Sequence, residues 1–202
     1  INSLKNVGME VIVNQVNHGM TGECLVLITP DHERTMYTHL GVSSELCTAD
    51  INKDAIVNSE YLLIEGYLVT SEHTKDAAIH SLNIATDNNV KKIITLSDPN
   101  IVNFFKDNMM ELINKKFDVI FCNKQESLNI SSTNNISSAM KFLKEFSKEV
   151  IITSGSEGAY VNHENELFHT PSKKANPIDL TGAGDMFLAA YMTAKIKNKN
   201  IT

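Results

Sequence analysis

The sequence has little of what would indicate a highly charged partner or a membrane. Of its 18 basic residues only Arg34 is an arginine, so the chain has no arginine cluster for phosphate. The net charge is −6 and no basic block occurs, which argues against nucleic acid as the main partner. No stretch is long and apolar enough to span a membrane. An anion-binding site would therefore depend on local geometry and a metal rather than on a broad positive field.

Cysteine is also scarce. Cys24, Cys47 and Cys122 are odd in number and lack the spacing of a metal site, which indicates reduced thiols and favours a cytoplasmic protein. Cys122 lies in an apolar run and is predicted to pack in the core.

The most informative stretch is residues 179–185, Asp-Leu-Thr-Gly-Ala-Gly-Asp, which leads directly into an apolar run from Met186. Glycines let backbone N–H groups approach a ligand closely, and the start of a helix presents unpaired N–H groups to an anion such as phosphate. Asp185 would repel that anion unless its carboxylate faces a substrate hydroxyl and takes its proton. An ordinary loop-to-helix junction with an acid in its first turn is the alternative.

The rest of the chain alternates between predicted strands and helices. We expect an antiparallel hairpin from strands at 24–29 and 34–38 joined by a turn at 30–33, and a weaker strand at 9–13. Further strands are predicted at 61–64, 90–96, 117–122, 149–153 and 159–161, and helices at 51–58 (capped by Asp50), 71–88, 99–112, 140–146 and after residue 182. Residues 127–138 are rich in Ser and Asn and are predicted to form an exposed, mobile loop. Strands alternating with helices predict an α/β fold with a mostly parallel sheet, whose carboxyl edge would carry Asp98, Asn123, Thr153 and the Gly182 turn.

Residues 179–185 resemble the D-T-x-G-A-G-D signature of the ribokinase-like (PfkB) carbohydrate and nucleoside kinases, with Leu180 in place of the usual Thr. The resemblance implies a ribokinase-like three-layer α/β/α fold with a small antiparallel β lid, here residues 1–45, over a nucleotide-binding core, residues 46–202. Residues 21–36 look most like the bacterial adenosine-kinase branch. Relative to the family, the opening βα units and the last helices are absent, so we expect a piece truncated at both ends.

The family's catalytic roles carry over onto the matching positions. Asp185 would be the general base, and Gly182, Ala183 and Gly184 would form the anion hole for the moving phosphoryl group. Thr181 would contact the nucleotide, and Asp179 corresponds to a position near a monovalent-cation site, with capping of the turn as its alternative role. The dependence on K⁺ stays open.

Two further segments match family motifs for ATP and Mg²⁺. Residues 123–126, Asn-Lys-Gln-Glu, match N-x-x-E, in which Asn123 and Glu126 would organise the water shell of Mg²⁺; an Asn turn followed by an acid in a helix is the alternative. Residues 153–159 resemble the T-x-G-x-x-G-A segment beside ATP, which assigns Thr153, Gly155 and Gly158 to the nucleotide, although a tight turn between strands is equally compatible.

Substrate contacts are assigned to Tyr67 and Arg34, with a buried core position and a solvated charge as the respective alternatives. The resemblance implies ATP-dependent phosphorylation of a primary hydroxyl on a small molecule, with adenosine favoured. A ribose- or fructose-type sugar kinase and a catalytically impaired ligand-binding relative are the alternatives. Relatives often pair through their lids, which suggests a homodimer.

Overall fold

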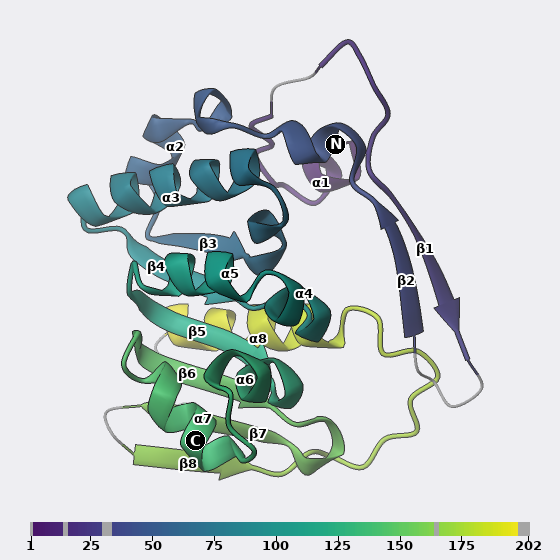
Figure 1. The fold of residues 1–202 in the computed structure, drawn as a ribbon, viewed down its shortest axis with the longest axis vertical. Helices are drawn as coiled ribbons and strands as arrows, with labels where there is room; N and C mark the ends of the chain where they lie inside the picture. The colour runs from purple at the N-terminus through teal and green to yellow at the C-terminus, as the bar shows by residue number, and fades with distance from the viewer. Residues whose placement is uncertain (1, 14–15, 30–33, 164–165, 198–202) are drawn as a thin grey trace.

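The computed structural model describes residues 2–13, 16–29, 34–163 and 166–197 of the 202-residue chain. They form a central six-stranded sheet with helices on both faces and a separate two-stranded ribbon (Figure 1). This is the predicted α/β fold with a mostly parallel sheet, and the predicted turn at 30–33 lies outside the described residues. No helix in these ranges is long and apolar enough to cross a membrane.

The central sheet has the strand order β3-β4-β5-β6-β7-β8. Strands β3 to β6 are mutually parallel, and β7 and β8 continue the sheet as antiparallel hairpins. Along the central strands, alternate residues point to opposite faces, so each face has its own apolar set. The strands are β3 Tyr61–Glu65, β4 Lys91–Thr95, β5 Phe117–Asn123, β6 Ser147–Thr153, β7 Ala159–His163 and β8 Glu166–Thr170.

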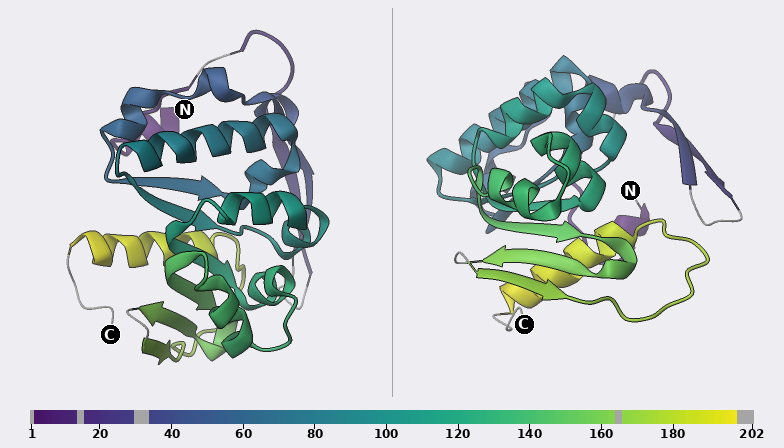
Figure 2. Two further views of the ribbon diagram at one scale, coloured as in Figure 1. Left: turned by 60° about the vertical axis from the view of Figure 1, so that its left-hand side comes forward. Right: turned by 60° about the horizontal axis from the view of Figure 1, so that its bottom comes forward.

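The connections between the parallel strands are helical and cover one face of the sheet (Figures 1 and 2). Helix α3 begins where the Ser71 hydroxyl accepts from the Thr74 N–H, and it buries Leu82 against Ile94 and Ile120 of the sheet. The helices and turns before β7 are α1 Asn2–Asn6, η1 Gly41–Glu45, η2 Thr48–Asp50, α2 Lys53–Val57, η3 Gly66–Thr70, α3 Glu72–Asp87, α4 Pro99–Phe104, α5 Lys106–Ile113, α6 Lys124–Ser131, α7 Ile136–Leu143 and η4 Gly155–Glu157.

Helix α8, Ala183–Ile196, lies on the opposite face and makes the third layer. Its residues Phe187, Tyr191 and Met192 pack on a second apolar cluster from the sheet, which includes Phe121 and Ile151. The ring of Tyr191 meets the ring of Phe121 edge to face at 5.4 Å.

The two-stranded ribbon corresponds to the predicted hairpin. Its strands β1 Glu23–Ile28 and β2 Arg34–His39 pair only with each other within the described residues, with Val26 opposite Met36. The ribbon projects from the body on the side where the parallel strands end, and side chains such as Leu25 and Tyr37 are exposed on it (Figures 1 and 2).

The prediction of a mobile loop at 127–138 is wrong, because α6 and α7 occupy most of this segment. Asn123 and Asn135 cap the two helices through their side-chain oxygens. The hydroxyls of Ser127 and Ser131 donate to carbonyls of their own helix, so the polar composition is satisfied locally. Ser127 is fully buried, and Ile130 joins the core.

Three smaller predictions also need correction. Residues 9–13 form no strand. Asn52 rather than Asp50 caps α2, since the Asp50 carboxylate accepts from the Cys47 N–H instead. The helix after Pro99 divides into α4 and α5 at Phe105, whose φ of −120° is not helical. In addition, β8 was not predicted from the sequence.

Candidate active site

The carboxyl ends of the parallel strands gather the predicted site residues along one edge of the sheet. Tyr67 follows β3, Asp98 follows β4, and Asn123 and Thr153 end β5 and β6 as register partners. Helix α8 runs antiparallel to these strands, because Lys195 near its end contacts Glu149 at the beginning of β6. The Gly182 turn at its start is therefore on the same edge (Figure 1).

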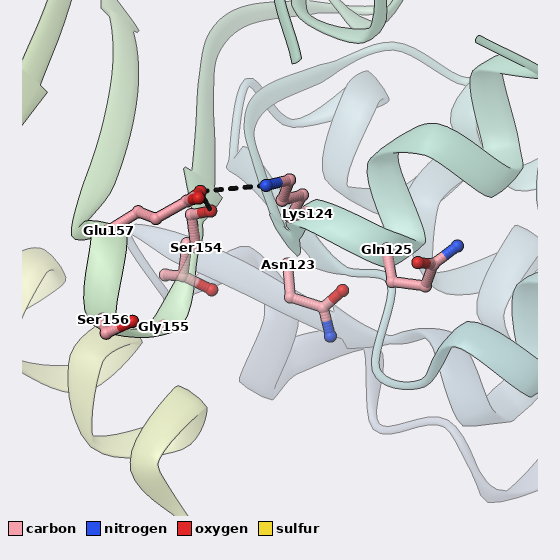
Figure 3. Close-up of a pocket in the computed structure, with 8 residues that line it drawn as sticks. Asn123, Lys124, Gln125, Ser154, Gly155, Ser156 and Glu157 are labelled. Carbon is pink, nitrogen blue, oxygen red and sulfur yellow. Dashed lines mark hydrogen bonds and ion pairs between the residues drawn. The ribbon is translucent and has the colours of Figure 1, made fainter. Parts of the chain in front are cut away.

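A pocket of about 420 Å³ opens between the ends of β5 and β6 (Figure 3). Three of the residues predicted to contact nucleotide or metal line it, namely Asn123, Thr153 and Gly155. The other lining residues are Lys124, Gln125, Ser154, Ser156 and Glu157. The walls are therefore polar, and they come from two segments about 30 residues apart that parallel pairing brings together.

Behind the pocket, Asn123 and Glu126 form a capping box at the start of α6. Glu126 accepts from the Asn123 backbone N–H at 2.9 Å and from its side-chain amide at 2.7 Å, and Asn123 accepts from the Glu126 N–H at 2.8 Å. Glu126 is only 4% exposed. Burial raises the pKa of Glu126 to about 7, against the effect of the Asn123 N–H and with a smaller contribution from the charge of Asp98.

Two residues that line the pocket, Lys124 and Glu157, form an ion pair (Figure 3). The Lys124 Nζ lies 2.9 Å from the Glu157 Oε2, which also accepts from the Ser154 hydroxyl at 2.6 Å. These two contacts, the Ser154 hydroxyl first, hold the pKa of Glu157 below its ordinary value. The pair links the start of α6 to the turn after β6.

The turn between β6 and β7 requires glycine. Gly158 has a φ of 98°, and a Cβ there would collide with the Thr170 carbonyl oxygen. Gly155 also has a positive φ, 53°, but faces open space. Thr153, Gly155 and Gly158 thus lie in one tight turn, which is the structural alternative raised from the sequence, while Thr153 and Gly155 also line the pocket.

The turn before α8 is open on its outer side. Gly182 has a φ of 76°, and a Cβ at Gly182 or Gly184 would meet nothing within 4 Å. The Asp179 carboxylate accepts from the Thr181 N–H at 2.8 Å, so it stabilises the turn. The Ala183 N–H donates to the Leu180 carbonyl, whereas Gly184 and Asp185, in the first turn of α8, have no partner for their N–H groups within the helix. Asp185 itself is exposed.

The two predicted substrate residues are on other elements than the segments that line the pocket. Tyr67 lies in the turn after β3 and is 39% exposed, so it is not a core residue. Arg34 begins β2 opposite Ile28, and its side chain lies outside the described part of the structure. Lys106, at the start of α5, donates to the Asn129 carbonyl and the Ser132 hydroxyl at the end of α6.

Sequence reasoning missed the Lys124–Glu157 pair, because 33 residues separate its members. The only available signal was that N-x-x-E and T-x-G-x-x-G each follow a strand of one parallel sheet. Among the described residues, no group of three His, Cys, Asp or Glu side chains could hold a metal ion.

Comparison with known proteins identifies a family. The model of the pfkB family carbohydrate kinases matches residues 1–202. A ribokinase from Staphylococcus aureus is 27% identical over 188 residues, and an adenosine kinase from Dictyostelium discoideum is 28% identical over 199 residues. These alignments include 89% and 90% of this chain.

Solved structures share the fold of this chain. The adenosine kinase from Sinorhizobium meliloti superposes on 99% of this chain with a TM-score of 0.93 and 26% identity. A candidate Ribokinase II from E. coli, in complex with ATP and Mg²⁺, superposes on 88% of it with a TM-score of 0.78 and 21% identity, which shows the shared fold. The chain corresponds to 57–58% of the two curated relatives and to 62% and 59% of the two structures.

Proposed function

The chain belongs to the pfkB family of carbohydrate kinases, and we propose that its protein transfers the γ-phosphoryl group of ATP to a primary hydroxyl of a nucleoside, with adenosine favoured. The observation that carries the proposal is the open glycine turn at the start of α8, on the same sheet edge as the pocket formed by Asn123 and Thr153. The turn supplies a place for developing negative charge, and the pocket supplies a polar cavity for the nucleotide.

In this proposal the turn stabilises the phosphoryl group during transfer. The N–H groups of Gly184 and Asp185 are the first candidates, since that of Ala183 donates to Leu180. Glycine at 182 and 184 leaves the approach open, because no Cβ projects there. Donors of this kind are each worth about 3–4 kcal/mol to the transition state in other enzymes.

Asp185 is proposed as the general base. Its carboxylate is exposed in the first turn of α8, beside the N–H groups that would bind the phosphoryl group. It would take the proton of the acceptor hydroxyl as that oxygen bonds to the γ-phosphorus and the bond to the β-phosphate oxygen breaks. A loose transition state demands little activation of the nucleophile, so a carboxylate of ordinary basicity is sufficient.

The residues present fit ATP and a hydrated Mg²⁺. Thr153 and Gly155, which line the pocket, would border the nucleotide together with Gly158. Thr181 would contact its phosphates. Mg²⁺ supplies charge neutralisation when bound. Because Glu126 is buried behind Asn123, these two residues would hold waters of the ion rather than the ion itself.

A monovalent cation near Asp179 remains a proposal carried by the family resemblance. In the structure, one oxygen of the Asp179 carboxylate already accepts from the Thr181 N–H.

The choice of acceptor is argued from similarity and from Tyr67. An adenosine kinase gives the highest structural similarity reported above, and Tyr67, 39% exposed after β3, carries an aromatic ring on which a base could stack. Arg34 would reach the acceptor from the ribbon. The similarity to a ribokinase, nearly equal in sequence identity, favours a sugar as the second candidate.

The test is an assay of ATP consumption by the complete gene product with adenosine, ribose or fructose as acceptor. We expect Mg²⁺-dependent ADP formation that is fastest with adenosine. Faster turnover with ribose or fructose would select the sugar-kinase alternative. ATP binding without turnover on any acceptor would indicate the ligand-binding relative, and absence of ATP binding would contradict the proposal altogether.

A further inference from the structure

The pocket contains one ion pair whose two members face the same cavity. Of the eight residues that line it, Lys124 is the only cation and Glu157 the only carboxylate, and they are bonded to each other. A polyphosphate that enters this pocket would be attracted by the Lys124 ammonium and repelled by the Glu157 carboxylate. While the two are paired, the charge of Glu157 offsets the attraction of Lys124, and the lysine can donate to the ligand only after it leaves the carboxylate.

This pair is held weakly enough to separate. The side chains of Lys124 and Glu157 are 46% and 54% exposed, and exposed ion pairs contribute little to stability. Lys124 is also the first residue of α6, where the helix dipole disfavours a positive charge. Glu157 keeps the Ser154 hydroxyl as a partner if the lysine leaves.

Arg34 and Lys106 are two cations that are less suitable for this role. The single arginine, Arg34, is on the ribbon. Lys106, near the same edge, already donates to two oxygens at the end of α6. Of these three cations, Lys124 is the one named among the residues that line the pocket, directly after Asn123 (Figure 3).

We propose that Lys124 exchanges partners when nucleotide binds, leaving Glu157 and donating to the phosphate chain of ATP, so that Glu157 opposes nucleotide binding until the exchange takes place. The inference rests on the proposed function, because it takes ATP as the ligand of this pocket. Lys124 then binds the polyphosphate directly, and Glu157 tunes the affinity by competing for the lysine.

The experiment measures the dissociation constant of ATP with Mg²⁺ by calorimetry in the complete gene product. Lys124→Met removes the attraction and should weaken ATP binding about tenfold. Glu157→Gln keeps an acceptor for Ser154, frees the lysine and removes a repelling charge, so it should tighten ATP binding about threefold. The two variants of one ion pair are thus expected to act in opposite directions.

A matched ion pair serves as control. Lys91 and Glu60 are paired at 3.2 Å with side chains 49% and 60% exposed, at the opposite, amino edge of the sheet. Lys91→Met and Glu60→Gln change the net charge equally and should leave the ATP dissociation constant within about twofold, since exposed charges at that distance are screened. Thermal unfolding of each variant checks that the fold is kept.

The outcomes are distinct. Opposite shifts at Lys124 and Glu157, absent from the controls, support the exchange. Shifts in the same direction would mean that the pair only supports the turn, and shifts no larger than those of the controls would mean that the phosphates lie elsewhere; either result overturns the inference. A wild-type protein that binds no ATP would overturn the proposed function together with it.

Discussion

The carboxyl group of Glu126 is enclosed by α6 and by the Asn123 side chain in front of it. Both of its oxygens accept hydrogen bonds, yet the loss of water around it outweighs them and raises its pKa from 4.5 to about 7. The same residue is predicted to organise Mg²⁺ water. A carboxyl that titrates near neutrality would make both protein stability and metal affinity depend on pH.

The stability effect has a definite sign. Because the pKa of Glu126 is higher in the folded than in the unfolded state, the folded protein binds the proton more tightly. The free energy of unfolding should therefore fall as the pH rises from about 4.5 through about 7. We expect the free energy of unfolding of Glu126→Gln to lack this dependence. Relative to wild type it should therefore rise by about 3 kcal/mol across that pH range.

Urea unfolding at several pH values checks this, with Glu145→Gln, an exposed carboxylate after α7, as the control. Wild-type and Glu126→Gln curves that stay parallel across the range would contradict the raised pKa.

At the scale of elements, helix α8 is attached to the sheet by a buried carboxylate. Glu149 of β6, 3% exposed at its side chain, accepts from the Tyr191 hydroxyl at 2.8 Å and from the Lys195 ammonium at 2.8 and 3.0 Å. This contact fixes the last turns of α8, and so the direction in which its first turn, with Asp185, presents the proposed anion hole.

Removal of one partner should weaken this attachment. Lys195→Met removes one of the two donors named above and leaves the buried Glu149 charge beside the other, the Tyr191 hydroxyl. We therefore expect a loss of about 2 kcal/mol in the free energy of unfolding. Adding Glu149→Gln should restore part of the loss, since a neutral amide needs no counter-ion. Lys197→Met, on the exposed end of the same helix, is the control. Equal losses for the two lysines would contradict the anchoring role.

The elements that could be predicted are those with a clear pattern in their own stretch of sequence. Helix α3 has a serine cap and an apolar face, and β4 to β6 are apolar runs bounded by turn residues, so their patterns are unambiguous. The start of α6 was raised only as the alternative for Asn123 and Glu126, and its extent was missed, because a run of Ser and Asn hides a helix whose polar groups bond within it. The split at Phe105 and the Lys124–Glu157 pair depend on tertiary packing, which no local pattern encodes.

At the scale of the whole molecule, the two-stranded ribbon has fewer neighbouring elements than the strands of the central sheet. Strand β5 lies between β4 and β6, whereas β1 and β2 have only each other among the described residues. The turns η1 and η2 lie closer to the body, since the Ser71 hydroxyl at the start of α3 donates to the Ser44 carbonyl at 3.2 Å. The division into a lid, residues 1–45, and a core, residues 46–202, remains a proposal, as does a homodimer formed through the ribbon.

Amide hydrogen exchange tests that division. We expect the amides of β1 and β2 to exchange at least about a hundredfold faster than those of β5, since an exposed two-stranded ribbon opens at little cost. Equal protection of β1 and β5 would show that the ribbon is not a separate unit, or that a second copy covers it.

The central claim is that Asp185 removes the acceptor proton beside the glycine turn, and the turnover of Asp185→Asn tests it most directly. The measurement uses the complete gene product at saturating ATP and acceptor, with Asp107→Asn, an acid in the first turn of α5, as the matched control. We predict that kcat falls at least about a hundredfold in Asp185→Asn while ATP affinity and thermal stability are kept, and that the control is unaffected. A kcat of Asp185→Asn within a few-fold of wild type would contradict the account.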